Sequence, residues 1–195
     1  MRGSELRASF AGLDRECGLD EAGRGCLAGP VTVGAVVLRA DQPLKGLNDS
    51  KQLSATERTR LEAEIKEKAW AWAVVHLEAE HIDRVNILQA VFDGMHAAVE
   101  TLRPVPELLL VDGNRFRPML GMAHRCIIKG DALYQSIAAA SILAKTARDR
   151  WMLEAHERFP HYHWDSNKGY PSPAHRKALL LHGPSPLHRR TFKGV

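Results

Sequence analysis

The chain has 195 residues, of which 45% are hydrophobic and 26% are charged. This length and composition are typical of one globular domain and exclude a disordered or fibrous protein. The sequence contains no run of about 18 uncharged apolar residues, which a membrane-spanning helix requires, so we expect no membrane association. It shows no apolar signal segment near residue 1 and no paired motif among its three cysteines, so we expect a cytoplasmic protein.

The net charge of +4 at pH 7 is unevenly placed along the chain. No acidic residue follows Asp165, whereas basic residues continue to the end, at Lys168, Arg176, Lys177, Arg189, Arg190 and Lys193. A basic segment of this kind is typical of proteins that bind a polyanion through its phosphates. A solvated basic tail without a partner is an equally good interpretation of the segment taken alone.

The apolar pattern predicts, in chain order, strands over 18–21 and 31–38, a helix over 54–69, a strand over 71–77, a helix over 80–102, strands over 108–111 and 124–128, and helices over 137–152 and 174–181. Ser54 and Glu57 have the spacing of a capping box at a helix start. The apolar residues between 80 and 102 recur at helical spacing and predict the longest helix, which Pro104 ends. Strands followed by alternating helices and strands indicate an α/β fold with a mixed sheet.

We expect a single domain over residues 1–195, without internal repeats. Its core spans about 12–158. A basic extension over about 159–195 begins where the chain becomes rich in His, aromatic residues and Pro. Within the predicted helix over 137–152, three consecutive alanines at 138–140 permit close packing on neighbouring elements.

Three of the predicted strands are followed by acidic residues. Asp20 and Glu21 end the first strand, Asp112 follows the fourth and Asp131 follows the fifth. Adjacent acids repel one another unless positive charge lies between them. Mg²⁺ and Mn²⁺ prefer hard oxygen ligands, and two such ions can promote phosphodiester hydrolysis. A single Asp at a strand end can simply cap a turn, but four acids in such positions predict a metal-dependent phosphodiesterase.

The turn Gly23-Arg24-Gly25 directly follows the first two acids. Glycine lets the backbone approach a ligand closely, and Arg can bind a phosphate through two parallel hydrogen bonds. A tight turn with an exposed Arg is the structural alternative. Gly18 and Gly23 have the spacing of a phosphate-binding loop, but no Lys-Ser/Thr pair follows and the loop contains two acids, which excludes that motif.

Three further residues are candidates for contacts with a nucleic acid. Lys51 lies in a polar loop and Ser136 begins the Ala-rich helix, so they offer an ammonium group and a hydroxyl to phosphates. Tyr170 follows a Lys-Gly pair and can stack on a sugar or a base. Each residue also fits a plain structural role, as a surface lysine, a helix-start hydroxyl or a half-buried tyrosine in a turn.

Six blocks of sequence, in order along the chain, resemble those of bacterial ribonuclease HII. They are GLDEAGRG at 18–25, NDSK at 48–51, VDGN at 111–114, KGD at 129–131, SIAAASI at 136–142 and KGYP at 168–171. The closing LHRRTF at 187–192 matches as well, so the resemblance runs from about residue 12 to Phe192. It departs from the family at Cys26, where proline is frequent.

The resemblance implies a ribonuclease H-like fold, a five-stranded mixed sheet flanked by helices with a small helical C-terminal extension. It implies an endonuclease that hydrolyses the RNA strand of RNA–DNA hybrids. This enzyme would also cut on the 5′ side of single ribonucleotides in duplex DNA, leaving a 3′-hydroxyl and a 5′-phosphate. We expect a monomer that uses Mn²⁺ or Mg²⁺, with two divalent ions during catalysis.

The resemblance also implies roles for individual residues. The four metal-binding catalytic acids would be Asp20, Glu21, Asp112 and Asp131. The turn that senses the ribose 2′-hydroxyl would be Gly23, Arg24 and Gly25, and the aromatic that packs on the deoxyribose at the RNA-to-DNA junction would be Tyr170. The residues alone, without the resemblance, lead only to a metal-dependent phosphodiesterase that acts on a polyanion.

Two other classes of protein remain compatible with the residues. One is a different two-metal nuclease of the same fold, such as a resolvase, a transposase or a proofreading exonuclease. Such an enzyme would cut all-DNA substrates and would leave the Gly-Arg-Gly turn unexplained. The other is a non-catalytic binding module, which would bind nucleic acid without metal and yield no product.

Overall fold

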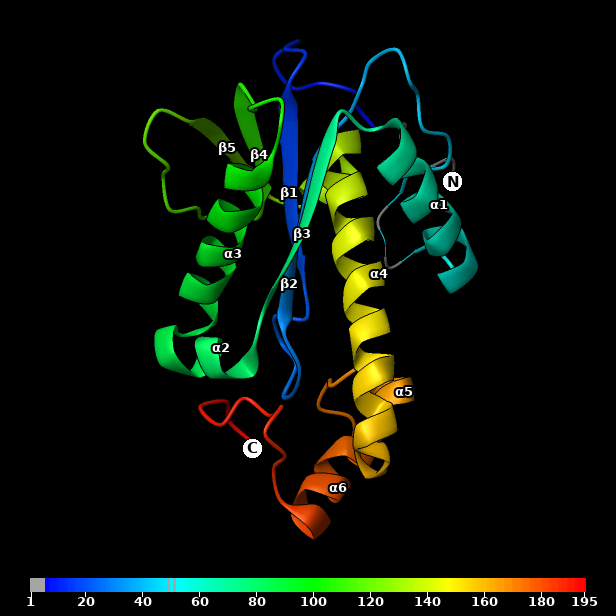
Figure 1. The fold of residues 1–195 in the computed structure, drawn as a ribbon, viewed down its shortest axis with the longest axis vertical. Helices are drawn as coiled ribbons and strands as arrows, with labels where there is room; N and C mark the ends of the chain where they lie inside the picture. The colour runs from blue at the N-terminus through cyan, green and yellow to red at the C-terminus, as the bar shows by residue number, and fades with distance from the viewer. Residues whose placement is uncertain (1–5, 49, 51) are drawn as a thin grey trace.

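The computed structural model, which describes residues 6–48, 50 and 52–195, contains a five-stranded mixed sheet with the order β3-β2-β1-β4-β5 (Figure 1). Its strands are β1 (Glu16–Ala22), β2 (Val31–Val37), β3 (Ala71–Leu77), β4 (Leu108–Asp112) and β5 (Ala123–Ile127). β2 is antiparallel to both β1 and β3, whereas β4 is parallel to β1 and to β5. The predicted mixed sheet is therefore confirmed.

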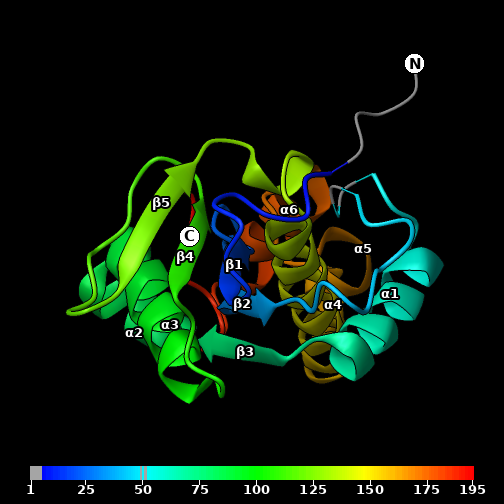
Figure 2. The ribbon, with the colours of Figure 1, turned by 90° about the horizontal axis from the view of Figure 1, so that it is seen from above.

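Helices cover both faces of the sheet (Figure 2). α1 (Ala55–Lys68) and α4 (Gln135–Arg158) lie on one face, and α2 (Ala79–Val85) and α3 (Ile87–Thr101) lie on the other. Ser54 forms the expected capping box, because its side chain accepts a hydrogen bond from the Glu57 amide and the Glu57 carboxylate accepts one from the Ser54 amide. Each face of the sheet thus has its own apolar cluster, and the sheet is buried between them.

A break divides the helix predicted over 80–102 into α2 and α3. At the break, Asn86 has a φ of 68°, a left-handed value that few residues other than Gly and Asn adopt readily. Its side-chain oxygen accepts hydrogen bonds from the amides of Leu88 and Gln89, so Asn86 is the N-cap of α3. The prediction of one continuous helix is wrong, because the apolar spacing continues across a residue that ends one helix and begins the next.

The long helix α4 packs directly against β1 and β2. A Cβ atom at Gly18 would overlap the Ser136 backbone, and one at Gly34 would overlap the Ala140 carbonyl. The alanines at 138–140 are fully buried in this contact. The close packing that the Ala-rich composition predicts is confirmed, and it requires glycine on the facing strands.

The C-terminal extension lies at one end of the molecule, beside the last turns of α4 (Figure 1). It contains the short helices η2 (Pro160–Tyr162), α5 (Trp164–Asn167) and α6 (Pro173–His182). Trp164 is fully buried and clusters with Met152 of α4 and with Ala28 from the loop between β1 and β2. The extension is therefore packed against the segment that follows the first two acids. No helix in the described ranges has the length and apolar character needed to cross a membrane.

Candidate active site

Three of the predicted acids meet at one edge of the sheet. Asp20 and Glu21 lie near the end of β1, and Asp112 ends β4. Because β1 and β4 are parallel and Leu19 lies opposite Val111, Asp20 and Asp112 follow at the same level on neighbouring strands. The sheet thus gathers these carboxylates, as their positions after apolar runs predict.

Asp20 is buried beside two other carboxylates. Its side chain is only 6% exposed, and burial together with the negative charges of Glu21 and Asp112 raises the pKa of Asp20 well above its usual range. Hydrogen bonds from the Ser141 hydroxyl and from the Glu21 amide, the latter at 2.7 Å, oppose part of this rise. Carboxylates this close together favour the binding of a cation.

Asp131 is joined to the other acids through the backbone. It lies in the 3-10 helix η1 (Gly130–Ala132) and is 7% exposed. The amide of the preceding Gly130 donates a hydrogen bond of 2.7 Å to Asp112 Oδ1. This bond brings the segment that carries Asp131 to the end of β4, although Asp131 itself is not among the residues that line the pocket described next.

A pocket of about 430 Å³ opens at this edge of the sheet. The predicted residues that line it are Asp20, Glu21, Asp112, Gly23, Arg24, Gly25 and Tyr170. Ser50, Ser141 and Lys145 line it as well, and the hydroxyls of Ser50 and Ser141 are 2.9 Å apart. The sequence signal for Ser141 is weak, since it is one hydroxyl within a run of small apolar residues on α4.

The turn after β1 presents its backbone to the pocket. Gly23 is buried with a φ of 88°, and a Cβ atom there would overlap the Arg148 side chain. A Cβ atom at Gly25 would meet nothing within 4 Å, so this glycine faces open space. The Arg24 side chain is half exposed and forms an ion pair of 3.3 Å with Glu21. The exposed Arg is what the structural alternative describes, and the open space in front of Gly25 is compatible with the predicted approach of the backbone to a ligand.

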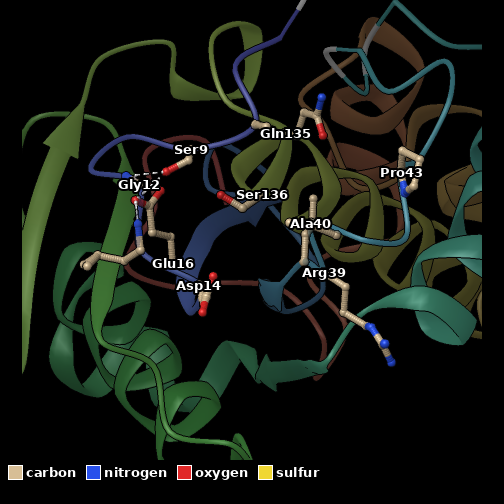
Figure 3. A pocket seen from close by; sticks show the side chains of 12 residues that line it. Ser9, Gly12, Asp14, Glu16, Arg39, Ala40, Pro43, Gln135 and Ser136 are labelled. Atoms are coloured by element: carbon tan, nitrogen blue, oxygen red, sulfur yellow. Dashed lines mark hydrogen bonds between the residues drawn. The ribbon is translucent and has the colours of Figure 1, made fainter.

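Two candidate substrate residues remain, Lys51 and Ser136. Lys51 is outside the described residues. Ser136 is 3% exposed and lines a different hollow of about 260 Å³, together with Glu16 at the start of β1 (Figure 3). The structure therefore does not bring Ser136 to the carboxylates, because the start of α4 lies against the first half of β1, and Ser141 is the α4 hydroxyl in the pocket.

The donor set of the pocket suits a hard divalent cation. Its charged oxygens come from Asp20, Glu21 and Asp112, and its hydroxyls come from Ser50 and Ser141. Within the described ranges, no group of three or more His, Cys, Asp or Glu side chains is arranged so that these residues alone could hold a metal ion. An open, partial shell of this kind fits Mg²⁺ or Mn²⁺, which keep waters and take substrate phosphate oxygens as further ligands.

Comparison with known proteins identifies the family. The model of the ribonuclease HII family matches residues 17–195. The chain is 55% identical over 181 residues to the ribonuclease HII of Porphyromonas gingivalis, an alignment that covers 93% of this chain and 90% of that protein. The range that the family model matches spans the positions of every block of sequence singled out above.

Two solved structures have the same fold. The ribonuclease H2 of Pyrococcus horikoshii superposes with a TM-score of 0.78 at 27% identity, covering 92% of this chain and 94% of that one. The ribonuclease HII of Archaeoglobus fulgidus, solved as a complex with PCNA, superposes with a TM-score of 0.74 at 29% identity, covering 89% and 91%. The chain belongs to the ribonuclease HII family and is a ribonuclease H endonuclease, which cleaves the RNA strand of RNA–DNA hybrids.

Proposed function

We propose that this enzyme also incises duplex DNA on the 5′ side of a single embedded ribonucleotide, leaving a 3′-hydroxyl and a 5′-phosphate. The observation that supports this specificity is the composition of the pocket. It places the carboxylates of Asp20, Glu21 and Asp112 beside the Gly23–Gly25 turn and Tyr170. The residues proposed for hydrolysis and those proposed for sugar recognition line one pocket, which supports the proposal.

We further propose that Asp20, Glu21, Asp112 and Asp131 hold two divalent ions, Mn²⁺ or Mg²⁺. Bound there, the ions would supply positive charge that favours both the attacking water and the departing 3′-oxygen. The chain contributes the placement of the carboxylates. Asp112 is oriented by the Gly130 amide and Asp20 by Ser141 and by the Glu21 amide. These hydrogen bonds leave the carboxylates preorganised before substrate arrives.

The Gly23–Gly25 turn is suited to recognise a ribose. A 2′-hydroxyl is both a donor and an acceptor, and it distinguishes RNA from DNA at one site. The backbone at Gly25 can be approached closely because no side chain fills the space in front of it. Tyr170 is 44% exposed and lines the same pocket, so its ring can pack on the neighbouring sugar.

The proposal also covers the state and location of the protein. We propose that the enzyme is a monomer. The three cysteines are unpaired, with Cys17 and Cys26 buried and Cys126 exposed, which supports a reducing compartment such as the cytoplasm. Light scattering of the purified protein tests the first point directly, and a mass twice that of the chain would contradict it.

The experiment that tests the proposed specificity uses an end-labelled DNA duplex with one ribonucleotide, incubated with Mn²⁺ or Mg²⁺. We expect one cut immediately 5′ of the ribonucleotide, no cut with EDTA and no cut in the matched all-DNA duplex. A continuous RNA–DNA hybrid serves as the positive control. Cutting of the hybrid without cutting of the single-ribonucleotide duplex would contradict the proposal while leaving the ribonuclease H activity intact.

A further inference from the structure

Two arginines are buried behind the Gly23–Gly25 turn. Arg148 of α4 is 1% exposed, and Arg189 of the C-terminal segment is 0% exposed. Burial lowers the pKa of Arg189 to about 10, so this side chain is still charged at pH 7. A buried guanidinium is tolerated only when its N–H groups are satisfied. Each of these two donates three hydrogen bonds, all to backbone carbonyl oxygens.

Arg189 holds the turn itself. It donates to the carbonyls of Gly23 at 2.8 Å, Arg24 at 2.9 Å and Gly29 at 3.0 Å. In a planar trans peptide, the carbonyl of one residue and the amide N–H of the next point in opposite directions. The carbonyls of Gly23 and Arg24 point toward Arg189. The amide N–H groups of the residues that follow them, Arg24 and Gly25, therefore point away from it. Both of these residues line the pocket, so the fork of Arg189 orients two donors toward the substrate side.

Arg148 joins the loop that follows this turn to the segment that carries Tyr170. It donates to the carbonyls of Ala28 at 3.0 Å and Pro30 at 2.9 Å, and also to that of Lys168 at 2.8 Å. Lys168 precedes Tyr170 by two residues, so one side chain links the loop after the turn to the segment that carries Tyr170. The absence of a side chain at Gly23 makes room for Arg148, as the overlap of a Cβ atom shows.

The C-terminal segment is anchored on both sides of Arg189. Its amide donates to the Leu27 carbonyl at 2.8 Å, and the Gly29 amide donates to the Leu187 carbonyl at 2.8 Å. Beyond it, the Asp83 carboxylate accepts hydrogen bonds from the amide of Arg190 at 2.8 Å and from that of Thr191 at 3.0 Å. These hydrogen bonds fix the backbone on both sides of Arg189 and so hold its guanidinium group against the turn.

We propose that Arg189, with Arg148 beside it, is a positioning residue for ribonucleotide recognition: it holds the Gly23–Gly25 turn so that the amides of Arg24 and Gly25 face the ribose and phosphate of the substrate. This inference rests on the proposed specificity for a single ribonucleotide. It assigns to the C-terminal segment a role in substrate selectivity. This role differs from charge attraction at the surface, because Arg189 is buried and cannot touch the nucleic acid.

The test compares Arg189→Lys with Arg190→Lys. Lysine keeps the charge but lacks the planar fork, so it cannot hold three carbonyls in the same geometry. Arg190 is the exposed neighbour, and its substitution by Lys keeps charge at the surface. We expect Arg189→Lys to lower kcat/KM on the single-ribonucleotide duplex at least tenfold more than on the continuous hybrid, where every position offers a 2′-hydroxyl. Arg190→Lys should leave this ratio unchanged.

A second readout does not depend on cleavage. Hydrogen exchange of the amides over residues 21–30 should be faster in Arg189→Lys than in the wild type and in Arg190→Lys. Because exchange needs no substrate, it tests the inference even if the wild type does not cut the single-ribonucleotide duplex, a result that would refute only the proposed specificity. If Arg189→Lys does not fold, Asp83→Asn is the alternative, because it weakens the hydrogen bonds that hold the amides of Arg190 and Thr191. Asp83→Asn should also lower the cleavage ratio and speed the exchange of the amides over residues 21–30. A wild-type cleavage ratio together with wild-type exchange would overturn the inference.

Discussion

At the scale of single residues, Asp20 shows the conflict between stability and function most clearly. The side chain is buried beside two other carboxylates, and these surroundings hold the pKa of Asp20 well above its usual range. A raised carboxyl pKa means that the folded state binds the proton more tightly than the unfolded state. Without a cation, this residue therefore reduces stability as the pH rises from the ordinary Asp value toward the raised one. The proposed role of Asp20 in holding a divalent ion would account for a residue that costs stability in this way.

We predict that Asp20→Asn stabilises the metal-free protein while abolishing cleavage. The amide has a similar shape but no charge, so the repulsion from Glu21 and Asp112 disappears. We expect the free energy of unfolding in EDTA at pH 7.5 to rise by roughly 1–2 kcal/mol, measured by urea denaturation. Asp14→Asn is the control, because Asp14 is exposed and lies outside the pocket. A metal-free Asp20→Asn protein that is less stable than the wild type would contradict this account of the site.

Asp112→Asn separates chemistry from binding. The Asn side-chain oxygen can still accept the hydrogen bond from the Gly130 amide, so the local structure should persist. Loss of the negative charge would remove a proposed ligand of the divalent ions, and we expect kcat on an RNA–DNA hybrid to fall at least ~100-fold. Hybrid binding in a gel-shift assay should stay within about threefold of the wild type, since the basic surface is unchanged. Near-normal turnover would refute the role assigned to Asp112.

At the scale of elements, the buried histidines of the C-terminal extension determine one another's protonation. Trp164 Nε1 donates to His175 Nε2 at 3.1 Å, and His188 Nε2 lies 3.0 Å from that same nitrogen. Trp is a donor only, so His175 Nε2 is an acceptor and His188 carries its proton on Nε2. His188 Nδ1 then accepts from the Ser185 amide, while His175 Nδ1 donates to the Tyr170 carbonyl at 2.9 Å. The network requires both rings to be neutral.

This network predicts acid sensitivity of the extension. Burial, and then the neighbouring His175, lowers the pKa of His188 to about 4 from its ordinary 6.5. A depressed histidine pKa means that protons favour the unfolded state, so stability is complete above about pH 6.5 and falls as the pH drops toward 4. The total loss should be roughly 3 kcal/mol. Thermal melts from pH 8 to 4.5 should show a flatter pH dependence for His188→Gln.

The control for this prediction is His182→Gln, because His182 is exposed at the end of α6. Its melting profile should keep the wild-type slope between pH 6.5 and 4. Equal slopes for the wild type and His188→Gln would show that His188 is not the group whose protonation destabilises the extension.

At the scale of the whole molecule, the close packing of α4 on the sheet determines where the α4 residues of the site lie. α4 contributes Ser141 and Lys145 to the pocket and Arg148 behind the turn. Its distance from β1 depends on Gly18, where a Cβ atom would overlap the Ser136 backbone. We also propose that the extension over 159–195 completes the substrate site as part of one domain, since Arg189 and Tyr170 both belong to it.

We predict that Gly18→Ala lowers stability, whereas Gly25→Ala lowers cleavage without changing stability. Gly18→Ala forces α4 away from β1 and should reduce the free energy of unfolding by about 3 kcal/mol, as overpacked cores do. Gly25→Ala adds a methyl group to open space, so its melting temperature should match the wild type while cleavage of the single-ribonucleotide duplex falls. Denaturation and cleavage assays on both variants check this. A destabilised Gly25→Ala would show that the turn has a packing role.

Local patterns in the sequence determine much of this protein. Apolar runs of the right length predict all five strands, and the acids that follow them predict where Asp20, Glu21 and Asp112 meet. The capping box at Ser54 and the close packing of the alanines on α4 are likewise local signals that the structure confirms. These features follow from the sequence because side-chain periodicity and chain direction are properties of neighbouring residues.

Other features depend on contacts between segments that are far apart in the sequence and meet only in the folded protein. Nothing local to Arg189 distinguishes it from the exposed Arg190, yet one is buried under a turn 160 or more positions away and the other faces solvent. Ser141 rather than Ser136 reaches the pocket because α4 crosses β1 at a particular register. Asn86 divides an apolar pattern that periodicity treats as continuous. Burial and long-range hydrogen bonding depend on tertiary packing, and this packing determines which of several equivalent side chains serve the site.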